Sequence, residues 1–457
     1  MKLPPCATVD WVKIFGVSLI LASILNGTTF FLKKVGVVNK EAYEAYWNVH
    51  SAGGPYSCRP LPRKQFLKEK PYTRYLFENK GGEILLKAIK DLLMAGFIFV
   101  SFILFLVRKE EITDRSFAWP ILSLVLLVAA ASLLTYEKYG GLFVAAGLRS
   151  FLFLGIASAG MWFVRSNGMG FLAACTGTLI LIQLLTTPLE LMYGLPLNGY
   201  HCFLTRPLPA RLSGTFVQPN SLGIFAVCAL AFYHDFSHSK KYLMWLLPFT
   251  LILVMASGSA TGLICLVVFL GILAIAHLGK KYQRISCAVL IALFMIMLIL
   301  LPRLIARPLL LDSIFGERGR LQVLQTVISS NSPYETIFGN GIGYGTNAAL
   351  TILQKDYLNK AVFGHDPVPL RSDSTITMMF WQIGTIGVVL FYTMVFLAML
   401  RHKKARIFYL TIILTSITIN ITELFPVNFL LGMALASSFS ITGRTSKKES
   451  ARQCQAA

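Results

Sequence analysis

Apolar runs long enough to cross a membrane recur along almost the whole chain. A run of about 17 to 25 such residues crosses the hydrocarbon layer as a helix, because a helix pairs every backbone polar group internally. The sequence predicts about twelve of these helices. They lie near residues 14–32, 88–107, 118–135, 141–164, 170–188, 219–234, 242–257, 261–277, 285–302, 376–400, 407–422 and 425–440.

The composition excludes a soluble globular protein. Of the 457 residues, 55% are hydrophobic and only 14% are charged, and the mean hydropathy is +0.64. A soluble domain could not cover that much apolar surface. We therefore expect an all-α, polytopic membrane helix bundle in which residues 1–457 form one integral membrane domain. The eight cysteines show neither metal-ligand spacing nor a CxxC pair, so no metal site is predicted.

The basic residues indicate how the chain is oriented. The net charge is +21, but the lysines and arginines form short clusters between apolar runs, which argues for contact with membrane lipids and against a nucleic-acid partner. When the helices are counted alternately, the short basic loops at Arg108–Lys109, Lys240–Lys241, Lys280–Lys281 and 401–406 fall on one side. Short basic loops face the cytoplasm, so both termini are predicted to be cytoplasmic.

Three long segments then face outward: the loop 33–87, the connection 188–214 and the large loop 303–375. Ionisable groups on loops beside a packed bundle are a common location for function, so we expect the active site on this face. Cys58 and Cys202 also lie there. They form either a disulfide or two separate thiols, because spacing alone does not show that they come within reach.

The large loop carries arginines and a cluster of glycines. Arg318 and Arg320 lie on a short helical pattern that precedes the stretch Gly339–Gly345, which includes Gly341 and Gly343. No strand precedes these glycines, so they are not a dinucleotide-binding fingerprint. They allow positive φ angles and close approach of the backbone.

Two residues near the end of this loop are candidate bases. A second helical pattern, with Leu350, Leu353, Tyr357 and Leu358 on one face, precedes His365, and Asp373 lies where the loop meets the next apolar run. Either side chain could accept a proton from a hydroxyl group. The alternatives are that Asp373 is only a helix cap and that His365 is only a surface residue.

Two arginines outside the large loop also lie beside or within apolar runs. Arg211 lies shortly before the helix start at Pro219–Asn220, where a guanidinium can bind phosphate oxygens and Asn220 can cap the helix. The alternative is an arginine that extends to the membrane interface. Arg149 lies inside the predicted helix 141–164, so we expect a buried partner, with a pairing to Glu137 or Glu190 as one reading and a functional role as the other.

Several of these motifs, taken in order, resemble the O-antigen ligase and polymerase superfamily of membrane glycosyltransferases. The matching residues are 211–216 with Pro219-Asn220-x-x-Gly223, Ser257-Gly-Ser259, Arg320, the cluster Gly339–Gly345, and a polar pair about eleven residues before Gly384-Thr-Ile-Gly387. The resemblance covers roughly residues 206–390 in motif and the whole chain in topology.

The resemblance implies a metal-independent glycosyltransferase without a cofactor, in the bacterial inner membrane, acting at the periplasmic face on undecaprenyl-diphosphate-linked glycans. It implies that Arg211 and Arg320 bind the diphosphate, and Arg318 and Arg371 are further candidates for this role. Fixed guanidinium groups can offset the charge that develops on a diphosphate leaving group. Supporting roles fall to Asn220, Gly341, Gly343 and Ser374, and a chain-length regulator and a flippase are further partners.

The chain departs from the family pattern at two places. Ser259-Ala260 replaces a Ser-Arg pair, and Asp373-Ser374 replaces a His-Asn pair. We therefore expect Asp373 to act as the base, with His365 as the second candidate. The missing histidine favours a polymerase of exopolysaccharide, capsule or O-antigen repeat units over a ligase that transfers polymer to lipid A-core. A lipid-linked oligosaccharide flippase and a non-catalytic assembly subunit remain as alternatives.

Overall fold

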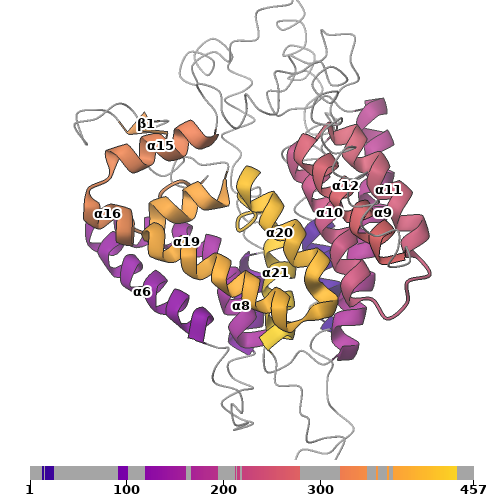
Figure 1. The fold of residues 1–457 in the computed structure, drawn as a ribbon, viewed down its shortest axis with the longest axis horizontal. Helices are drawn as coiled ribbons and strands as arrows, with labels where there is room; N and C mark the ends of the chain where they lie inside the picture. Colours follow the sequence, from indigo (N-terminus) through magenta and orange to yellow (C-terminus); the bar gives the residue numbers. More distant parts are fainter. Residues whose placement is uncertain are drawn as a thin grey trace, which may run out of the picture.

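The structure, a computed structural model, describes residues 13–14, 16–24, 91–100, 119–160, 166–193, 212, 214–216, 219–277, 320–346, 357–358, 368–369 and 374–439. These residues are almost entirely helical, as Figure 1 shows. Of the expected outward segments, the loop 33–87 and much of the loop 303–375 lie outside the described residues. The all-α class is confirmed for the part of the chain that is described.

The elements follow the apolar runs closely. The helices are α6 (Trp119–Tyr139), α7 (Gly141–Leu148), η3 (Arg149–Phe151), α8 (Leu152–Gly160), α9 (Ser166–Tyr193), α10 (Pro219–Phe236), α11 (Leu243–Ser257), α12 (Ala260–His277), α15 (Arg320–Ser330), α16 (Pro333–Phe338), α19 (Thr375–Arg401), η5 (Lys403–Ala405), α20 (Arg406–Thr418) and α21 (Val427–Phe439). A further helical segment covers Asp91–Val100. The strands β1 (Tyr357–Leu358) and β2 (Val368–Pro369) pair in antiparallel fashion.

Among the described residues, four helical stretches are long and apolar enough to cross a membrane. They are Trp119–Tyr139, Gly141–Gly160, Gly168–Pro188 and Thr375–Arg401, and shorter apolar helices accompany them. The chain is therefore a membrane protein of helical type. The number of about twelve spans and the orientation stay predictions.

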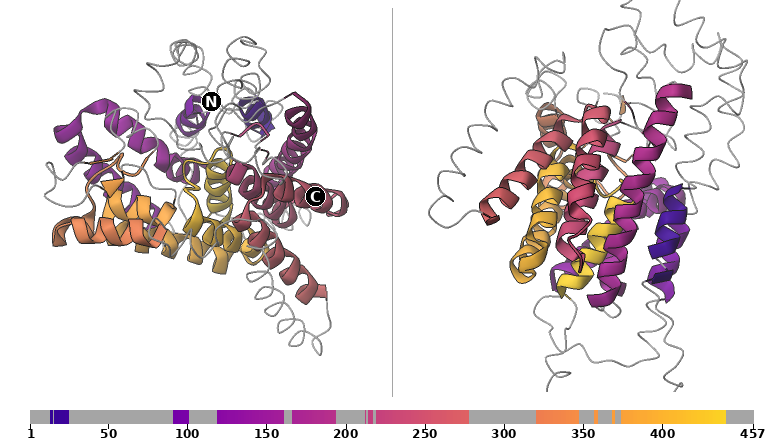
Figure 2. Two further views of the ribbon diagram at one scale, coloured as in Figure 1. Left: turned by 90° about the horizontal axis from the view of Figure 1, so that it is seen from above. Right: turned by 90° about the vertical axis from the view of Figure 1, so that its right-hand side faces the viewer.

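The helices pack side by side along a common direction (Figure 2, right). The bundle has three parts in Figure 1. One group on the right consists of α9, α10, α11 and α12, the middle is formed by α20 and α21, and the left is formed by α6, α15, α16 and α19. Helix α10 is almost completely buried because α9, α11, α12 and α20 all pack against it. Helix α8 lies so close to α21 that a Cβ on Gly432 would come within 2.8 Å of Ile156 Cβ.

Two local expectations are wrong, and so is the alternative that Asp373 caps the helix. Tyr357–Leu358 form strand β1 and not part of a helix, because their backbone pairs with Val368–Pro369 and this pairing overrides the helical periodicity. The N-cap of α19 is Ser374 and not Asp373. Helix α10 begins at Pro219, a favourable first residue, so Asn220 is its second residue and not its cap.

Candidate functional site

Most of the side chains predicted to carry the chemistry lie outside the described residues. This holds for Arg211, Arg318, His365, Arg371 and Asp373, and of Arg320 only the backbone is described, as the first residue of α15. Their roles stay predictions. The structure does describe the residues next to several of them, and these neighbours show how firmly each segment is held.

The segment after Arg211 is fixed by a buried glutamine. Gln183 of α9 donates from Nε2 to Thr215 Oγ1 at 2.6 Å, and its Oε1 accepts the Thr215 backbone N–H at 3.0 Å. Gln183 is only 3% exposed. We call this pair of hydrogen bonds the Gln183 clamp. The backbone N–H of Leu212 donates to Ala256 O at 2.9 Å, so the residue directly after Arg211 is also attached to the end of α11.

Glycines allow the close contacts around the clamp. Gly214 has φ +54°, and a Cβ there would lie 2.5 Å from Gln183 Oε1. A Cβ on Gly223 of α10 would lie 2.5 Å from Ser257 Oγ. Ser259 precedes α12 and accepts the Gly262 N–H at 3.2 Å, which caps that helix. The described residues of the motifs at 211–223 and 257–259 therefore pack directly against each other.

A kink in α19 creates the binding place for the stretch Gly339–Gly345, which we call the glycine loop. Ile383 and Gly384 have non-helical backbone angles, so the carbonyls of the preceding turn lose their helical partners. Asn340 N donates to Trp381 O at 2.8 Å and Gly341 N donates to Gln382 O at 3.1 Å. The loop thereby satisfies acceptors that the kink exposes.

The glycine loop is inserted between α19 and the pair α6–α7. A Cβ on Gly341 would lie 2.3 Å from Thr135 Oγ1, and one on Gly343 would lie 2.5 Å from Phe143 Cε1. All four glycines of the loop have positive φ, between 71° and 108°. The expectation of positive φ and close backbone approach at Gly341 and Gly343 is confirmed, whereas their part in binding a substrate stays a prediction.

Aromatic packing closes the loop. Tyr344 is fully buried, its carbonyl accepts from Gln382 Nε2 at 2.6 Å, and its hydroxyl is hydrogen-bonded to that of Tyr139. Its ring packs at 5.7 Å from that of Trp381, and Val327 of α15 joins the same apolar cluster. Helix α15, which begins at Arg320, is therefore held against α19 by this cluster.

The residues after Asp373 are also fixed. Thr375 Oγ1 donates to Ile419 O at 2.9 Å and accepts the Ile421 N–H at 3.0 Å. The first turn of α19 is thus attached to the connection between α20 and α21. Ser374, a predicted supporting residue, is 3% exposed.

Arg149 has a partner that the sequence did not reveal. Its Nε lies 3.5 Å from Asp91 Oδ2, whereas Glu137, one of the two expected partners, is exposed at the end of α6. Ser150 donates to Glu423 Oε1 at 3.3 Å. The expected helix 141–164 is interrupted here by the 3₁₀ turn η3. The expected partner is therefore present, but it comes from a helix far away in the sequence.

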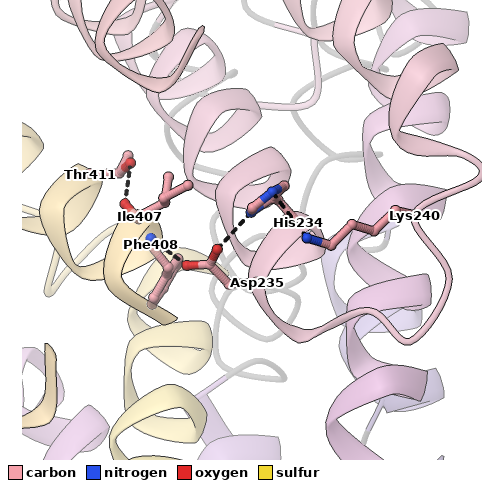
Figure 3. A network of polar contacts seen from close by, with 6 residues as sticks. All are labelled: His234, Asp235, Lys240, Ile407, Phe408 and Thr411. Carbon is pink, nitrogen blue, oxygen red and sulfur yellow. Dashed lines mark hydrogen bonds and ion pairs between the residues drawn. The ribbon is translucent and has the colours of Figure 1, made fainter. Parts of the chain in front are cut away.

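A polar network that joins the end of α10 to the start of α20 was not predicted (Figure 3). Asp235 Oδ2 accepts the Phe408 N–H at 2.8 Å and so caps the first turn of α20. The N-cap residue of α20 itself, Ala405, makes no side-chain hydrogen bond to this turn. His234 Nδ1 lies 2.7 Å from Asp235 Oδ1. Burial raises the pKa of Asp235, while the bonds to His234 and Phe408 act in the opposite direction.

The contacts define two ends of the bundle. The motif end contains the Gln183 clamp, Ser257–Ser259, the glycine loop and the start of α19. The opposite end contains Asp235 and His402. Burial lowers the pKa of His402. Neighbouring helices such as α10 and α11 therefore alternate in direction, as the sequence predicts. Within the described ranges, no group of three or more His, Cys, Asp or Glu side chains could hold a metal ion.

Comparison of the chain with protein-family models, with curated proteins and with solved structures found no match.

Proposed function

We propose that the chain is a membrane glycosyltransferase that polymerises undecaprenyl-diphosphate-linked oligosaccharide repeat units at the periplasmic face of the inner membrane. The observation that supports this proposal is the convergence of the motif segments. The described residues Leu212, Gly214 and Thr215, together with Ser257–Ser259, the glycine loop and the start of α19, all lie at the motif end. Each is held by buried hydrogen bonds or close glycine contacts.

Such rigidity suits transfer from a lipid diphosphate. The leaving group develops negative charge, and donors that are already in position stabilise it without reorganisation. Arg211 directly precedes the residue bonded to Ala256, and Arg320 begins the helix packed on α19. In this proposal both guanidinium groups bind the diphosphate, and Asp373 removes the proton from the acceptor hydroxyl.

The lipid-linked oligosaccharides that accumulate when the protein is lost test the proposal. We expect single repeat units on undecaprenyl diphosphate and no longer chains. Finished polymer left on the lipid would instead identify a ligase. Repeat units that stay inaccessible from the periplasm would identify a flippase, and an unchanged lipid-linked pool would contradict all three activities. Restoring the gene is the control, because it must restore the original pool.

A further inference from the structure

Helix α16 has an exposed face made of apolar side chains. Tyr334, Ile337 and Phe338 are spaced as i, i+3 and i+4, so they project from one side of the helix. They are 58%, 45% and 40% exposed, and the rings of Tyr334 and Phe338 pack against each other at 5.0 Å. A contiguous exposed face of this kind marks a surface that contacts a membrane or another molecule.

The acidic residue of α16 does not interrupt this face. The Glu335 carboxylate accepts the Ser332 N–H at 2.8 Å, and Ser332 Oγ accepts the Glu335 N–H at 3.3 Å. This capping box holds Glu335 at the start of the helix. Because a helix turns by about 100° per residue, Glu335 projects to one side of the face that begins with Tyr334.

Helix α16 is attached to α19 at the kink. Thr385 Oγ1 donates to Thr336 O at 2.9 Å, and a Cβ on Gly384 would lie 2.1 Å from Ile337 O. After the kink, the large exposed apolar residues of α19 are spaced as on one helix face. They are Ile386, Val389, Phe396 and Leu400. Since α19 is long and apolar enough to cross a membrane, this face contacts lipid, and α16 is attached directly beside its end.

The position of α16 along α19 decides whether its apolar face meets lipid or water. Arg401, Lys403 and Lys404 mark one membrane surface, because a charged group inside the hydrocarbon layer is costly. From Arg401 back to Gly384 the distance is about 26 Å along a helix that rises about 1.5 Å per residue. The hydrocarbon layer is about 30 Å thick, and a tilt of α19 would only bring Gly384 deeper. Helix α16 is therefore attached at the boundary of this layer and not above it in water.

We propose that α16 is an interfacial helix whose apolar face contacts the acyl chains of phospholipids at the motif end. Tyrosine suits this position, since its ring is apolar and its hydroxyl reaches the headgroups. The large loop 303–375 thus returns to the bilayer at α16. The glycine loop follows directly after Phe338, so this part of the motif end borders on lipid. Membrane contact of α16 is independent of sugar transfer and is tested apart from the proposed function.

Spin labels on α16 test the contact. With its eight natural cysteines replaced by alanine, the protein carries a nitroxide at Ile337→Cys or Phe338→Cys in nanodiscs of phosphatidylethanolamine and phosphatidylglycerol. Power saturation compares collisions with oxygen, which is concentrated in lipid, and with a water-soluble nickel chelate. The references are Phe396→Cys, on the lipid-facing side of α19, and Ser329→Cys, an exposed polar position on α15. We expect the oxygen-to-nickel ratio at both α16 positions to lie nearer to that of Phe396→Cys.

Two results would overturn the proposal. A ratio like that of Ser329→Cys at both α16 positions would show that the apolar face is in water. Few collisions with either reagent would show that protein covers the face, as in a second copy or another partner.

A cross-link gives a second measurement in a protein that keeps its natural cysteines. The photoreactive residue p-benzoylphenylalanine in place of Phe338 preserves an aromatic side chain, and illumination of membranes should give a phospholipid adduct, detected by mass spectrometry. An adduct to protein alone would contradict the proposal. If the labels on α16 report lipid but the purified protein transfers no sugar, the interfacial helix stands and only the proposed function falls.

Discussion

Single buried polar residues position the groups proposed to act at the motif end. Gln183 is the clearest example, because both ends of its amide bond Thr215. We expect Gln183→Leu to reduce sugar transfer by about 10-fold or more, since a buried N–H and hydroxyl lose their partner at a cost of roughly 1–3 kcal/mol. Gln183→Glu, neutral when buried, offers one donor and one acceptor and should restore part of the activity. Transfer by membranes that contain equal amounts of each variant measures the effect.

The control for Gln183 comes from the same helix. Thr176 is equally buried, but its hydroxyl bonds only Ala173 O of its own helix, at 2.7 Å. Thr176→Val should therefore retain transfer. Equal losses in Thr176→Val and Gln183→Leu would show that α9 is merely sensitive to substitution.

The arginines proposed to bind the diphosphate permit a conservative test. We expect Arg211→Lys and Arg320→Lys each to lose most transfer activity while the protein still inserts, because an ammonium group cannot reproduce the planar set of guanidinium donors. Transfer from the lipid-linked donor and the amount of protein in the membrane are measured together. Full activity in either variant would mean that the arginine serves only as an interfacial anchor or as a charge.

The base is tested by removing the charge of Asp373. We expect Asp373→Asn to lower turnover by about 10²- to 10⁴-fold while donor binding survives. The N-cap position of α19 is Ser374, so the substitution leaves the N-cap residue unchanged. Turnover in the purified variant, with donor binding measured alongside, gives the result. Normal turnover in Asp373→Asn together with loss in His365→Ala would assign the base to the histidine.

At the scale of elements, the kink of α19 is what holds the glycine loop. A Cβ on Gly384 would lie 2.1 Å from Ile337 O, and the residue has φ +67°. We expect Gly384→Ala to lower the melting temperature of the purified protein strongly, because backbone angles of φ +67° and ψ −170° alone cost about 1–3 kcal/mol for a residue with a side chain. Gly140→Ala is the control, since it has φ +79° and no atom within 4 Å of the added Cβ. The smaller drop in melting temperature expected for Gly140→Ala measures the cost of a positive φ without a clash. Equal drops in the two variants would show that the close contact of Gly384 contributes nothing to stability.

The sequence predicts elements better than it predicts contacts between them. Apolar runs mark α6, α9 and α19 because their length is dictated by the membrane. The pair Arg149–Asp91 and the cap that Asp235 gives to α20 could not be predicted, because each joins residues far apart in the sequence. The glycine spacing predicted positive φ, but not that a kink at Gly384 supplies the acceptors.

At the scale of the whole molecule, the two ends of the bundle lead to a prediction about orientation. From the short basic loops we expect the opposite end, with His402 and η5, to face the cytoplasm. Single cysteines at Ser329 and Lys404, both exposed, report on the two ends. With the eight natural cysteines replaced by alanine, we expect a membrane-impermeant maleimide added outside spheroplasts to label Ser329→Cys only. Both positions should react after the cells are opened, which is the control for reactivity. Labelling of Lys404→Cys alone in intact spheroplasts would place the motif end in the cytoplasm, where lipid-linked repeat units are not polymerised by the proposed route, and the proposed function would fall with the orientation.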